Sequence, residues 1–419
     1  MTVCDIIVIG GGPAGMMAAG KAAERGAAVA LIEKNQRNGK KLLITGKGRC
    51  NVTNNCSRDE FFANIPVNPK FLYSAFSQFS NRDVMDFFET NGVPLKVERG
   101  NRVFPVSDRA YDINNALIGY CKKGGVHVIR DTATDLSIVK GSISGVKLKN
   151  GGEVRCSQCI IATGGKSYPL TGSTGDGYLL AESVGHTIVA PKPSLVPIEI
   201  DGRECAEAQG LSLRNIAIRV SDPENGKTVY EDFGEMLFTH FGMSGPVILS
   251  ASSHMRDPNK KYKISIDLKP ALTPEQLDNR ILRDFSENIN KDFVNSLSKL
   301  LPQKIISVII KRTGIPYSAK VNSIRREQRL ALAGLLKNLE FDVAGFRPID
   351  EAIITSGGIC VTEIKPKTME SKIVAGLYFA GEVIDVDAHT GGFNLQIAFS
   401  TGCCAGISAA ERMGFYSYD

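Results

Sequence analysis

The sequence predicts an α/β protein, with a βαβ pattern near the start of the chain and a strand–helix pattern near its end. Residues 5–33 read as a strand, a glycine-rich turn, a helix and a second strand, which is the pattern of a βαβ unit. Residues 376–409 again read as a strand followed by a glycine-initiated helix. Between these ends, short alternating strands and then helical stretches interrupt the pattern. The middle of the chain is therefore expected to be an inserted domain.

The expected domain boundaries lie where the βαβ character stops and resumes. A chain of 419 residues exceeds the size at which a single core usually keeps growing. We expect the core domain over 1–190 and 346–419, with a β-rich part of the insertion over 191–270 and a helical part over 271–345. The β-rich part is read as a barrel or a sandwich. The helical part opens at Thr273, where Thr-Pro-Glu-Gln has the form of a capping box.

Composition indicates a globular chain without export or membrane signals. Hydrophobic residues make up 43% and charged residues 22%, so a substantial core can be buried. The first residues lack a basic stretch, and no uninterrupted apolar run reaches about 18 residues. Ten cysteines are scattered along the chain, as suits a reducing compartment. We expect a cytoplasmic protein without a membrane partner, and its net charge of +6 argues only weakly for a polyanionic one.

The glycine-rich turn has the spacing of a dinucleotide fingerprint. Gly10, Gly12 and Gly15 form GxGxxG directly after the first strand. The first glycine makes the tight turn, the second lets the backbone approach a pyrophosphate, and the third lets the helix pack on the strand. Pro13 and Ala14 then begin the helix, whose N-terminal amides and dipole attract phosphate. All five residues are expected to bind the dinucleotide.

An acid and a basic segment follow the second strand. Glu33 closes that strand, where a carboxylate can accept hydrogen bonds from both hydroxyls of a ribose and repel the 2′-phosphate of NADP. The segment after it could lie along a pyrophosphate or be a solvated loop; its basic residues are Lys34, Arg37, Lys40, Lys41, Lys47 and Arg49. The fingerprint alone does not separate FAD from NAD.

The C-terminal motif favours FAD. Residues 376–382, GLYFAGE, form an apolar strand that ends in a glycine and an acid, Gly381 and Glu382. This resembles the second FAD motif of the glutathione-reductase-like flavoproteins, which implies that Glu382 binds the ribityl chain and that the amides around Asn394 and Leu395 face the flavin ring. A helix N-terminus there would stabilise the negative charge of reduced flavin.

Three further strings extend the resemblance to the whole chain. They are GKGRCNVTN at 46–54, LFTHFGMSGPVILSAS at 237–252 and EIKPKTMESK at 363–372. They look like the hallmark strings of the BaiN-like (YhiN-like) flavoproteins, described as NAD(P)/FAD-dependent oxidoreductases and sometimes as aminoacetone-oxidase-like. The resemblance implies a two-segment Rossmann-like FAD-binding domain with an inserted domain.

Resemblance also supplies further cofactor candidates. Residues 159–165, CIIATGG, are similar to the Ala-Thr-Gly segment of the same superfamily, and 171–186 resemble the Thr-Gly-Asp-Gly helix of fumarate-reductase and L-aspartate-oxidase flavoproteins. Asp176 is therefore read as a cofactor residue or, alternatively, as a helix N-cap. The other cofactor residues expected in this way are Lys34, Gly48, Arg49, Cys50, Asn51, Ala133, Thr163 and Gly164.

The expected function is that of an FAD-dependent oxidoreductase acting on a small organic substrate. No second GxGxxG follows a strand, so NADH or NADPH would bind transiently in the cleft above the flavin. The alternatives are an RNA- or tRNA-modifying flavoprotein and an amine oxidase that uses oxygen. Nucleic acid is not the expected partner, because no basic stripe is interleaved with aromatic residues.

Catalytic residues are only weakly indicated. Two histidines, His240 and His389, could transfer protons or orient a substrate. No metal is expected: Cys156 and Cys159 have CxxC spacing without a second ligand pair. Cys50 and Cys56 lie where disulfide reductases carry a redox pair, although CxxxxxC is not the spacing of those enzymes.

Overall fold

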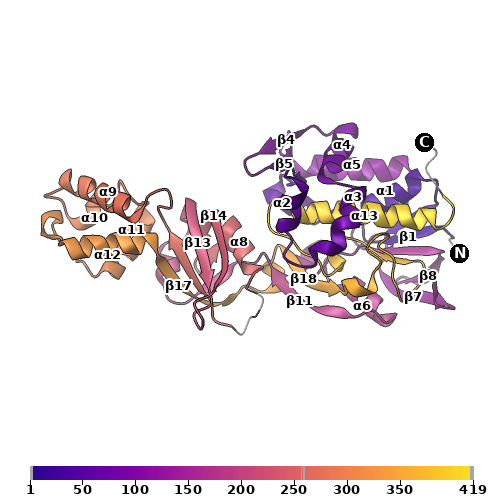
Figure 1. Ribbon diagram of the computed structural model, residues 1–419. Coiled ribbons are helices and arrows are strands. Elements are labelled where there is room, and N and C mark those ends of the chain that lie inside the picture. The colour runs from indigo at the N-terminus through magenta and orange to yellow at the C-terminus, as the bar shows by residue number, and fades with distance from the viewer. Residues whose placement is uncertain (1–2, 256, 258–259, 416–419) are drawn as a thin grey trace. The chain divides into compact units, whose positions relative to one another are not determined.

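The chain divides into two compact units. The computed structural model describes residues 3–255, 257 and 260–415. Unit 1 combines Met1–Ser194 with Ile349–Asp419, and unit 2 is Leu195–Pro348 (Figure 1). The predicted boundary at 190/191 falls inside a strand that ends at Ser194 and pairs with a strand from the C-terminal segment. This strand therefore belongs to unit 1.

A five-stranded parallel sheet forms the centre of unit 1. Its order is β19-β10-β1-β2-β6, and all its pairings are parallel. The strand bounds are Ile6–Ile9 (β1), Val29–Ile32 (β2), His127–Ile129 (β6), Gln158–Ile161 (β10) and Leu377–Phe379 (β19). Strand β19 comes from the far end of the chain and lies next to β10, so the predicted α/β core with two chain segments is confirmed.

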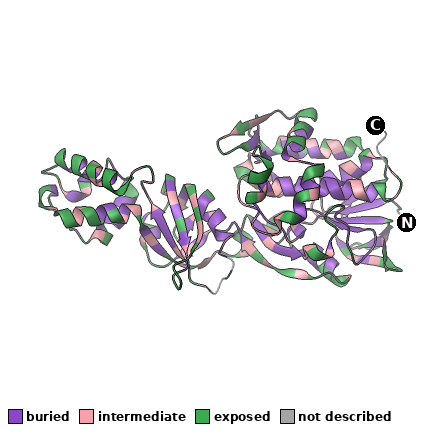
Figure 2. Cartoon of the chain, in the orientation of Figure 1, coloured by how far each residue is buried: buried purple, intermediate pink, exposed green. Residues whose placement is uncertain are grey.

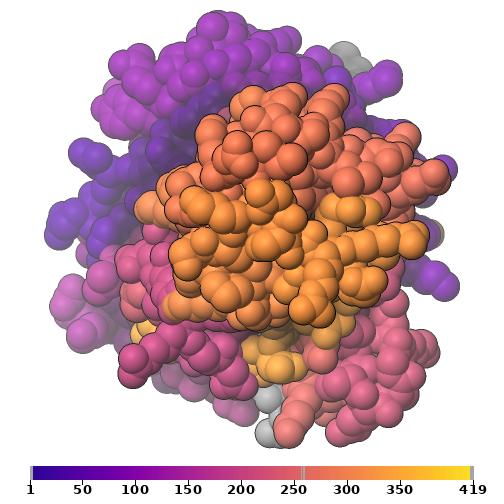
Figure 3. Space-filling view, turned by 90° about the vertical axis from the view of Figure 1, so that its left-hand side faces the viewer, coloured from indigo at the N-terminus to yellow at the C-terminus, as the bar shows by residue number. Residues whose placement is uncertain are grey.

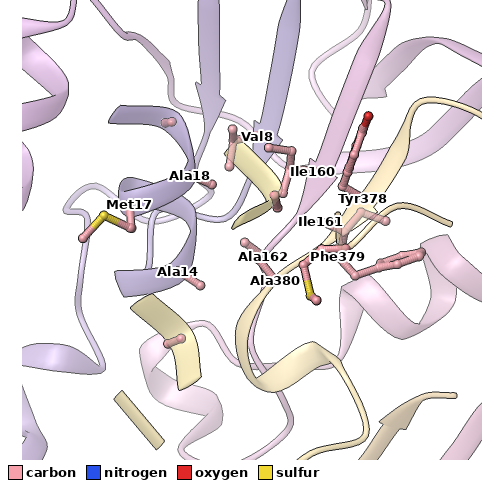
Figure 4. Close-up of a cluster of buried hydrophobic side chains, with 14 of the residues drawn as sticks. Val8, Ala14, Met17, Ala18, Ile160, Ile161, Ala162, Tyr378, Phe379 and Ala380 are labelled. Atoms are coloured by element: carbon pink, nitrogen blue, oxygen red, sulfur yellow. The ribbon is translucent and has the colours of Figure 1, made fainter. Parts of the chain in front are cut away.

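Two helices from opposite ends of the chain pack against each other in this core. Helix α1 (Pro13–Glu24) lies against α13 (Phe393–Glu411) and also against α5 (Ala110–Lys123). A Cβ atom at Gly402 or Gly406 would collide with the backbone of Ala14 or Ala18, so these glycines set how closely α13 can approach α1. Figure 4 shows α1 residues among the apolar side chains of β1, β10 and β19.

Smaller elements surround the central sheet. Two three-stranded antiparallel sheets and one strand pair contain β3 (Thr53–Asn54), β4 (Leu95–Glu98), β5 (Arg102–Pro105), β7 (Ala133–Val139), β8 (Ser142–Leu148), β9 (Glu153–Arg155), β11 (Ile188–Ser194) and β18 (Ile354–Ile359). The short helices are α2 (Arg58–Ala63), α3 (Tyr73–Gln78), α4 (Asn81–Thr90) and α6 (Asp176–Ser183).

Unit 2 contains a closed six-stranded barrel. Its strands run in the order β12-β15-β14-β13-β16-β17, and every pairing is antiparallel. The bounds are Ile198–Ile200 (β12), Ser212–Ser221 (β13), Thr228–Phe238 (β14), Gly242–Ser244 (β15), Lys263–Asp267 (β16) and Leu339–Phe346 (β17), with short helices α7 (Glu204–Glu207) and α8 (Pro246–Ser252). A barrel is thus found, and not a sandwich.

Helices connect the last two barrel strands. They are α9 (Pro274–Ser286), α10 (Phe293–Ser296), α11 (Gln303–Thr313) and α12 (Arg326–Lys337); Figure 3 shows their surface in orange, and Figure 2 shows buried faces turned inward. Thr273 and Gln276 form the predicted capping box of α9. The predicted helical range of 271–345 extended too far, because the alternating residues Leu339 and Phe341 are buried and pair as strand β17.

Candidate cofactor site

The three fingerprint glycines meet different surroundings. A Cβ atom at Gly10, where φ is +106°, would lie 2.5 Å from the Ala162 carbonyl oxygen, and one at Gly15 would collide with the Gly10 carbonyl. At Gly12 nothing lies within 4 Å of that position. Packing therefore requires the first and third glycines, whereas the second borders open space that a ligand can approach. Pro13 is the first residue of α1, and Ala14 is buried behind it.

Glu33 is fixed beside this turn. Its carboxylate is buried; Oε2 accepts a hydrogen bond from the Gly11 amide at 2.7 Å, and Oε1 accepts one from the Asn35 amide at 2.7 Å. The predicted ribose acid and the predicted phosphate turn thus lie side by side at the carboxyl ends of β1 and β2, the edge at which dinucleotide folds bind their ligands.

Lys34 and Asp176 meet across a long stretch of sequence. The Lys34 Nζ atom lies 2.5 Å from Asp176 Oδ2 and 2.5 Å from Thr174 Oγ1. Asp176 is the first residue of α6 and Gly175 is its N-cap, so the alternative reading of Asp176 as the N-cap is wrong. The start of α6 is thereby brought to the segment that follows β2.

Three buried polar atoms around this region lack a hydrogen-bond partner in the described part of the protein. They are Thr163 Oγ1, Tyr178 Oη and Asn51 Oδ1. Thr163 and Gly164 follow β10, where Gly164 has φ +75°. Burying an unpaired polar atom is costly. Unsatisfied groups on two predicted cofactor residues are what a site built for a polar ligand should contain, so the residues fit a bound FAD.

The C-terminal motif supplies the residues of the predicted site that come from the other end of the chain. Gly381 (φ +77°) and Glu382 follow β19 after a single intervening residue, Ala380. Both carboxylate oxygens of Glu382 lie within hydrogen-bond distance of Lys41 Nζ, at 3.1 and 2.8 Å. Ser167 and the Thr355 amide also bond this carboxylate. Sequence reasoning named Glu382 and missed Ser167 and Thr355, because neither belongs to a recognisable motif.

Helix α13 begins beside strand β3 of the first chain segment. A Cβ atom at Gly392 would collide with the Thr53 carbonyl, and Asn54 Nδ2 donates to the Gly391 carbonyl at 3.0 Å. The Asn394 side chain bonds the Ala388 amide and carbonyl at 3.0 and 2.7 Å, so it fixes the turn that precedes the helix. Leu395 is half-buried in the first turn. The 19-residue helix presents a positive dipole end here.

The loop over 46–54 is folded on itself. Gly48 and Cys50 have φ values of +83° and +61°, and burial raises the pKa of the Cys50 thiol to about 12. The Arg49 guanidinium stacks 4.2 Å from the centre of the Phe104 ring and bonds Asp108 at 2.6 Å as well as Glu98. Arg49 is therefore held by two carboxylates of its own unit.

The remaining predicted residues are dispersed. Ala133 is buried at the start of β7, four residues after β6. His389 precedes α13, where burial lowers its pKa to about 4 and its Nδ1 atom lies 3.1 Å from Asn64 Oδ1. His240 is exposed in unit 2, between β14 and β15. The two histidines thus belong to different units.

Among the described residues no group of three or more potential metal ligands occurs, and no described helix is long and apolar enough to cross a bilayer.

Comparison with known proteins gives matches over nearly the whole chain. A family described as "HI0933-like protein Rossmann domain" matches residues 4–408. The chain is 33% identical to a ribosomal RNA dihydrouridine synthase of Escherichia coli, over 97% of this chain and 98% of that one. It is 30% identical to a 3-dehydro-bile acid delta(4,6)-reductase of Clostridium scindens, over the same shares.

Solved structures show the same fold at low identity. A 3-ketosteroid-delta4-(5alpha)-dehydrogenase from Rhodococcus jostii superposes with a TM-score of 0.51 at 14% identity, covering 98% of this chain and 97% of its own. This likeness concerns the fold alone. From the family match and the relatives, the chain belongs to the HI0933-like family, the BaiN/YhiN-like FAD-dependent oxidoreductases, as the sequence motifs predicted.

Proposed function

We propose that the protein uses FAD to reduce a carbon–carbon double bond that is conjugated with a carbonyl group. The observation that carries this proposal is the full-length similarity to two enzymes of different substrates. Forming dihydrouridine saturates a ring double bond conjugated with a carbonyl, and the name of the bile acid enzyme describes reduction of double bonds in a 3-oxo compound. The shared reaction class is a better guide than either substrate.

The proposed FAD site extends from the glycine turn to the start of α13. The pyrophosphate would bind in the open space at Gly12, next to the N-terminus of α1, and Glu33 would accept hydrogen bonds from the ribose hydroxyls. Glu382 would accept a hydrogen bond from a ribityl hydroxyl, while the N-terminal amides of α13 would face the flavin pyrimidine. The chemistry that FAD supplies when bound is hydride exchange at its ring.

Besides FAD, the reaction needs a proton, an oriented substrate and a source of electrons. Reduction of a conjugated double bond needs a proton as well as a hydride; the hydride would come from FAD and the proton from solvent water. His389 is neutral at neutral pH because burial lowers its pKa, so it would orient a substrate through a hydrogen bond more readily than protonate one. NADH or NADPH would reduce the flavin from the position that the substrate later occupies, because the sequence has no second dinucleotide fingerprint.

Two substrate classes fit this chemistry. A uridine of ribosomal RNA is suggested by the E. coli relative, whose similarity covers 97% of this chain. A small enone is suggested by the bile acid reductase at 30% identity. The sequence-based preference for a small molecule stays a prediction.

Anaerobic reduction and reoxidation of the bound flavin tests the proposal. The holoprotein is mixed in separate samples with NADH, NADPH or an amine while the visible flavin spectrum is followed. The reduced protein is then offered unmodified ribosomal RNA, a 3-oxo-4-ene steroid or oxygen. We expect reduction by a nicotinamide, then reoxidation by RNA or enone with a product that gains two hydrogens. Reduction by an amine only, followed by reoxidation by oxygen, would overturn the proposal in favour of an amine oxidase.

A further inference from the structure

One ion pair joins the two halves of the proposed FAD site. Lys41 Nζ lies 2.8 Å from Glu382 Oε2, although the two residues are 341 positions apart. About four-fifths of each side chain is buried, with 21% of Lys41 and 22% of Glu382 exposed. Shielding of this degree distinguishes the pair from an ordinary surface salt bridge, whose contribution is screened by water.

The backbone places Lys41 beside the glycine turn. The Gly39 amide donates to the Gly11 carbonyl at 2.8 Å, while the Gly11 amide donates to Glu33. The segment that carries Lys41 is thus tied to the same residue that fixes the predicted ribose acid. Lys40, its neighbour, is exposed and instead donates to the Leu170 carbonyl at 2.6 Å.

The two carboxylate oxygens of Glu382 have different numbers of hydrogen-bond partners. Oε1 lies within hydrogen-bond distance of the Thr355 amide at 2.8 Å, of Ser167 Oγ at 3.1 Å and of Lys41 Nζ at 3.1 Å. Oε2 accepts from Lys41 only, within the described part of the chain. A carboxylate oxygen can accept two bonds, so Oε2 keeps one acceptor position open.

A glycine lies beside this oxygen. A Cβ atom at Gly164 would lie 4.0 Å from Glu382 Oε2, and the φ of +75° at Gly164 disfavours any larger residue. Lys41 also balances the charge of Glu382, so the carboxylate need not be neutralised by another group. Ser167 adds a further tie, because its hydroxyl lies 2.7 Å from Lys41 Nζ.

We propose that Lys41 is a positioning residue of the cofactor site. It orients Glu382 so that Oε2 accepts a hydrogen bond from a hydroxyl of the FAD ribityl chain. This inference rests on the proposed FAD site. Lys41 acts through Glu382 and makes no contact of its own with the cofactor. Its charge assists the cofactor indirectly, because an unpaired Glu382 would stand as a bare anion near the pyrophosphate.

FAD titration of the full-length apoprotein tests this role. The variants are Lys41→Met, Lys41→Arg, Glu382→Gln and the double variant, with Lys40→Met as a control that removes the same charge next door. Flavin fluorescence quenching gives the dissociation constant, and thermal unfolding of each apoprotein reports whether it is folded. We expect Lys41→Met to weaken FAD binding about tenfold or more, Lys41→Arg to restore most of it, and Lys40→Met to change it less than threefold.

The double variant separates positioning from direct contact. If Lys41 acts through Glu382, then Lys41→Met should add no more than threefold to the loss caused by Glu382→Gln. Multiplication of the two losses would overturn the inference, since it would indicate an independent contact between Lys41 and the cofactor. Equal binding by Lys41→Met and Lys40→Met would also overturn it. Failure of the wild-type protein to bind FAD would instead overturn the proposed function.

Discussion

The Glu33 Oε2 atom accepts a hydrogen bond from the Gly11 amide at 2.7 Å. This contact joins the end of β2 to the turn after β1, and the two elements hold each other in place. Because the acid is buried and its other oxygen is bonded by the Asn35 amide, its side chain has little freedom. A ribose placed at this edge would meet an acceptor that is already oriented.

Replacing this acid should reduce FAD binding. Glu33→Arg introduces a cation where the ribose hydroxyls need an acceptor and leaves the Gly11 amide without its partner. We expect flavin occupancy of the purified protein to fall at least tenfold, since hydrogen bonds to charged groups contribute roughly 1.5–3 kcal/mol. Glu89→Arg, at an exposed position of α4, makes the same charge change and should leave occupancy intact. Unchanged occupancy in Glu33→Arg would move the adenosine elsewhere.

Substitution by alanine should impair FAD binding at Gly12 and stability at Gly15. Gly12 has ordinary dihedral angles for any residue, φ −80° and ψ −176°, and open space at its Cβ position. Gly12→Ala should therefore fold normally but weaken FAD binding, because the methyl group occupies the approach of the pyrophosphate. Gly15→Ala should destabilise the protein by about 2–4 kcal/mol, because its Cβ atom collides with the Gly10 carbonyl. Thermal unfolding of the apoproteins and FAD titration distinguish the two effects.

The parts of the fold with local sequence signals were predictable. GxGxxG, the strand-terminal acid and the capping box at Thr273 each depend on a few neighbouring residues, so the βαβ unit and the start of α9 could be read directly. That both chain ends contribute to one domain followed from resemblance to known flavoproteins, whereas the pairing of β19 with β10 is seen only in the structure. Strand β17 was missed because it follows a long helix directly, and only its pairing with β16 reveals it.

Long-range contacts in the site were not predictable. Lys41 was one of six basic residues in a short segment, and no local feature showed that it alone reaches Glu382. Arg49 belongs to a family string, yet its guanidinium pairs with Asp108, 59 positions away. Tyr178 was not singled out in the sequence, and only the structure reveals that its hydroxyl lacks a partner among the described residues. Such roles depend on where distant segments meet.

The buried, neutral His389 should make the protein less stable in mild acid, because the same residue is protonated in the unfolded state. Its pKa is lowered by burial from 6.5 to about 4, so the folded state binds fewer protons than the unfolded state between these values. Stability contributed by the neutral ring is complete above about pH 6.5 and falls as the pH approaches 4. At pH 5 the loss is about 2 kcal/mol relative to pH 7. Urea unfolding should show this loss in the wild type and a smaller one in His389→Gln; equal losses would contradict the prediction.

The order of binding gives the last prediction. With a single dinucleotide fingerprint in the sequence, we expect the nicotinamide donor and the acceptor to use the same face of the flavin in turn. Each must leave before the other binds, which makes the kinetics ping-pong. Steady-state rates at varied donor and acceptor should give parallel double-reciprocal lines, with competitive inhibition by the donor against the acceptor at high concentration. The contrary result is a set of intersecting lines or a ternary complex stable to titration, either of which requires a separate donor site. Gly12→Ala, reconstituted with excess FAD, should keep the parallel pattern, because that substitution affects the pyrophosphate and not the face at which hydride is exchanged.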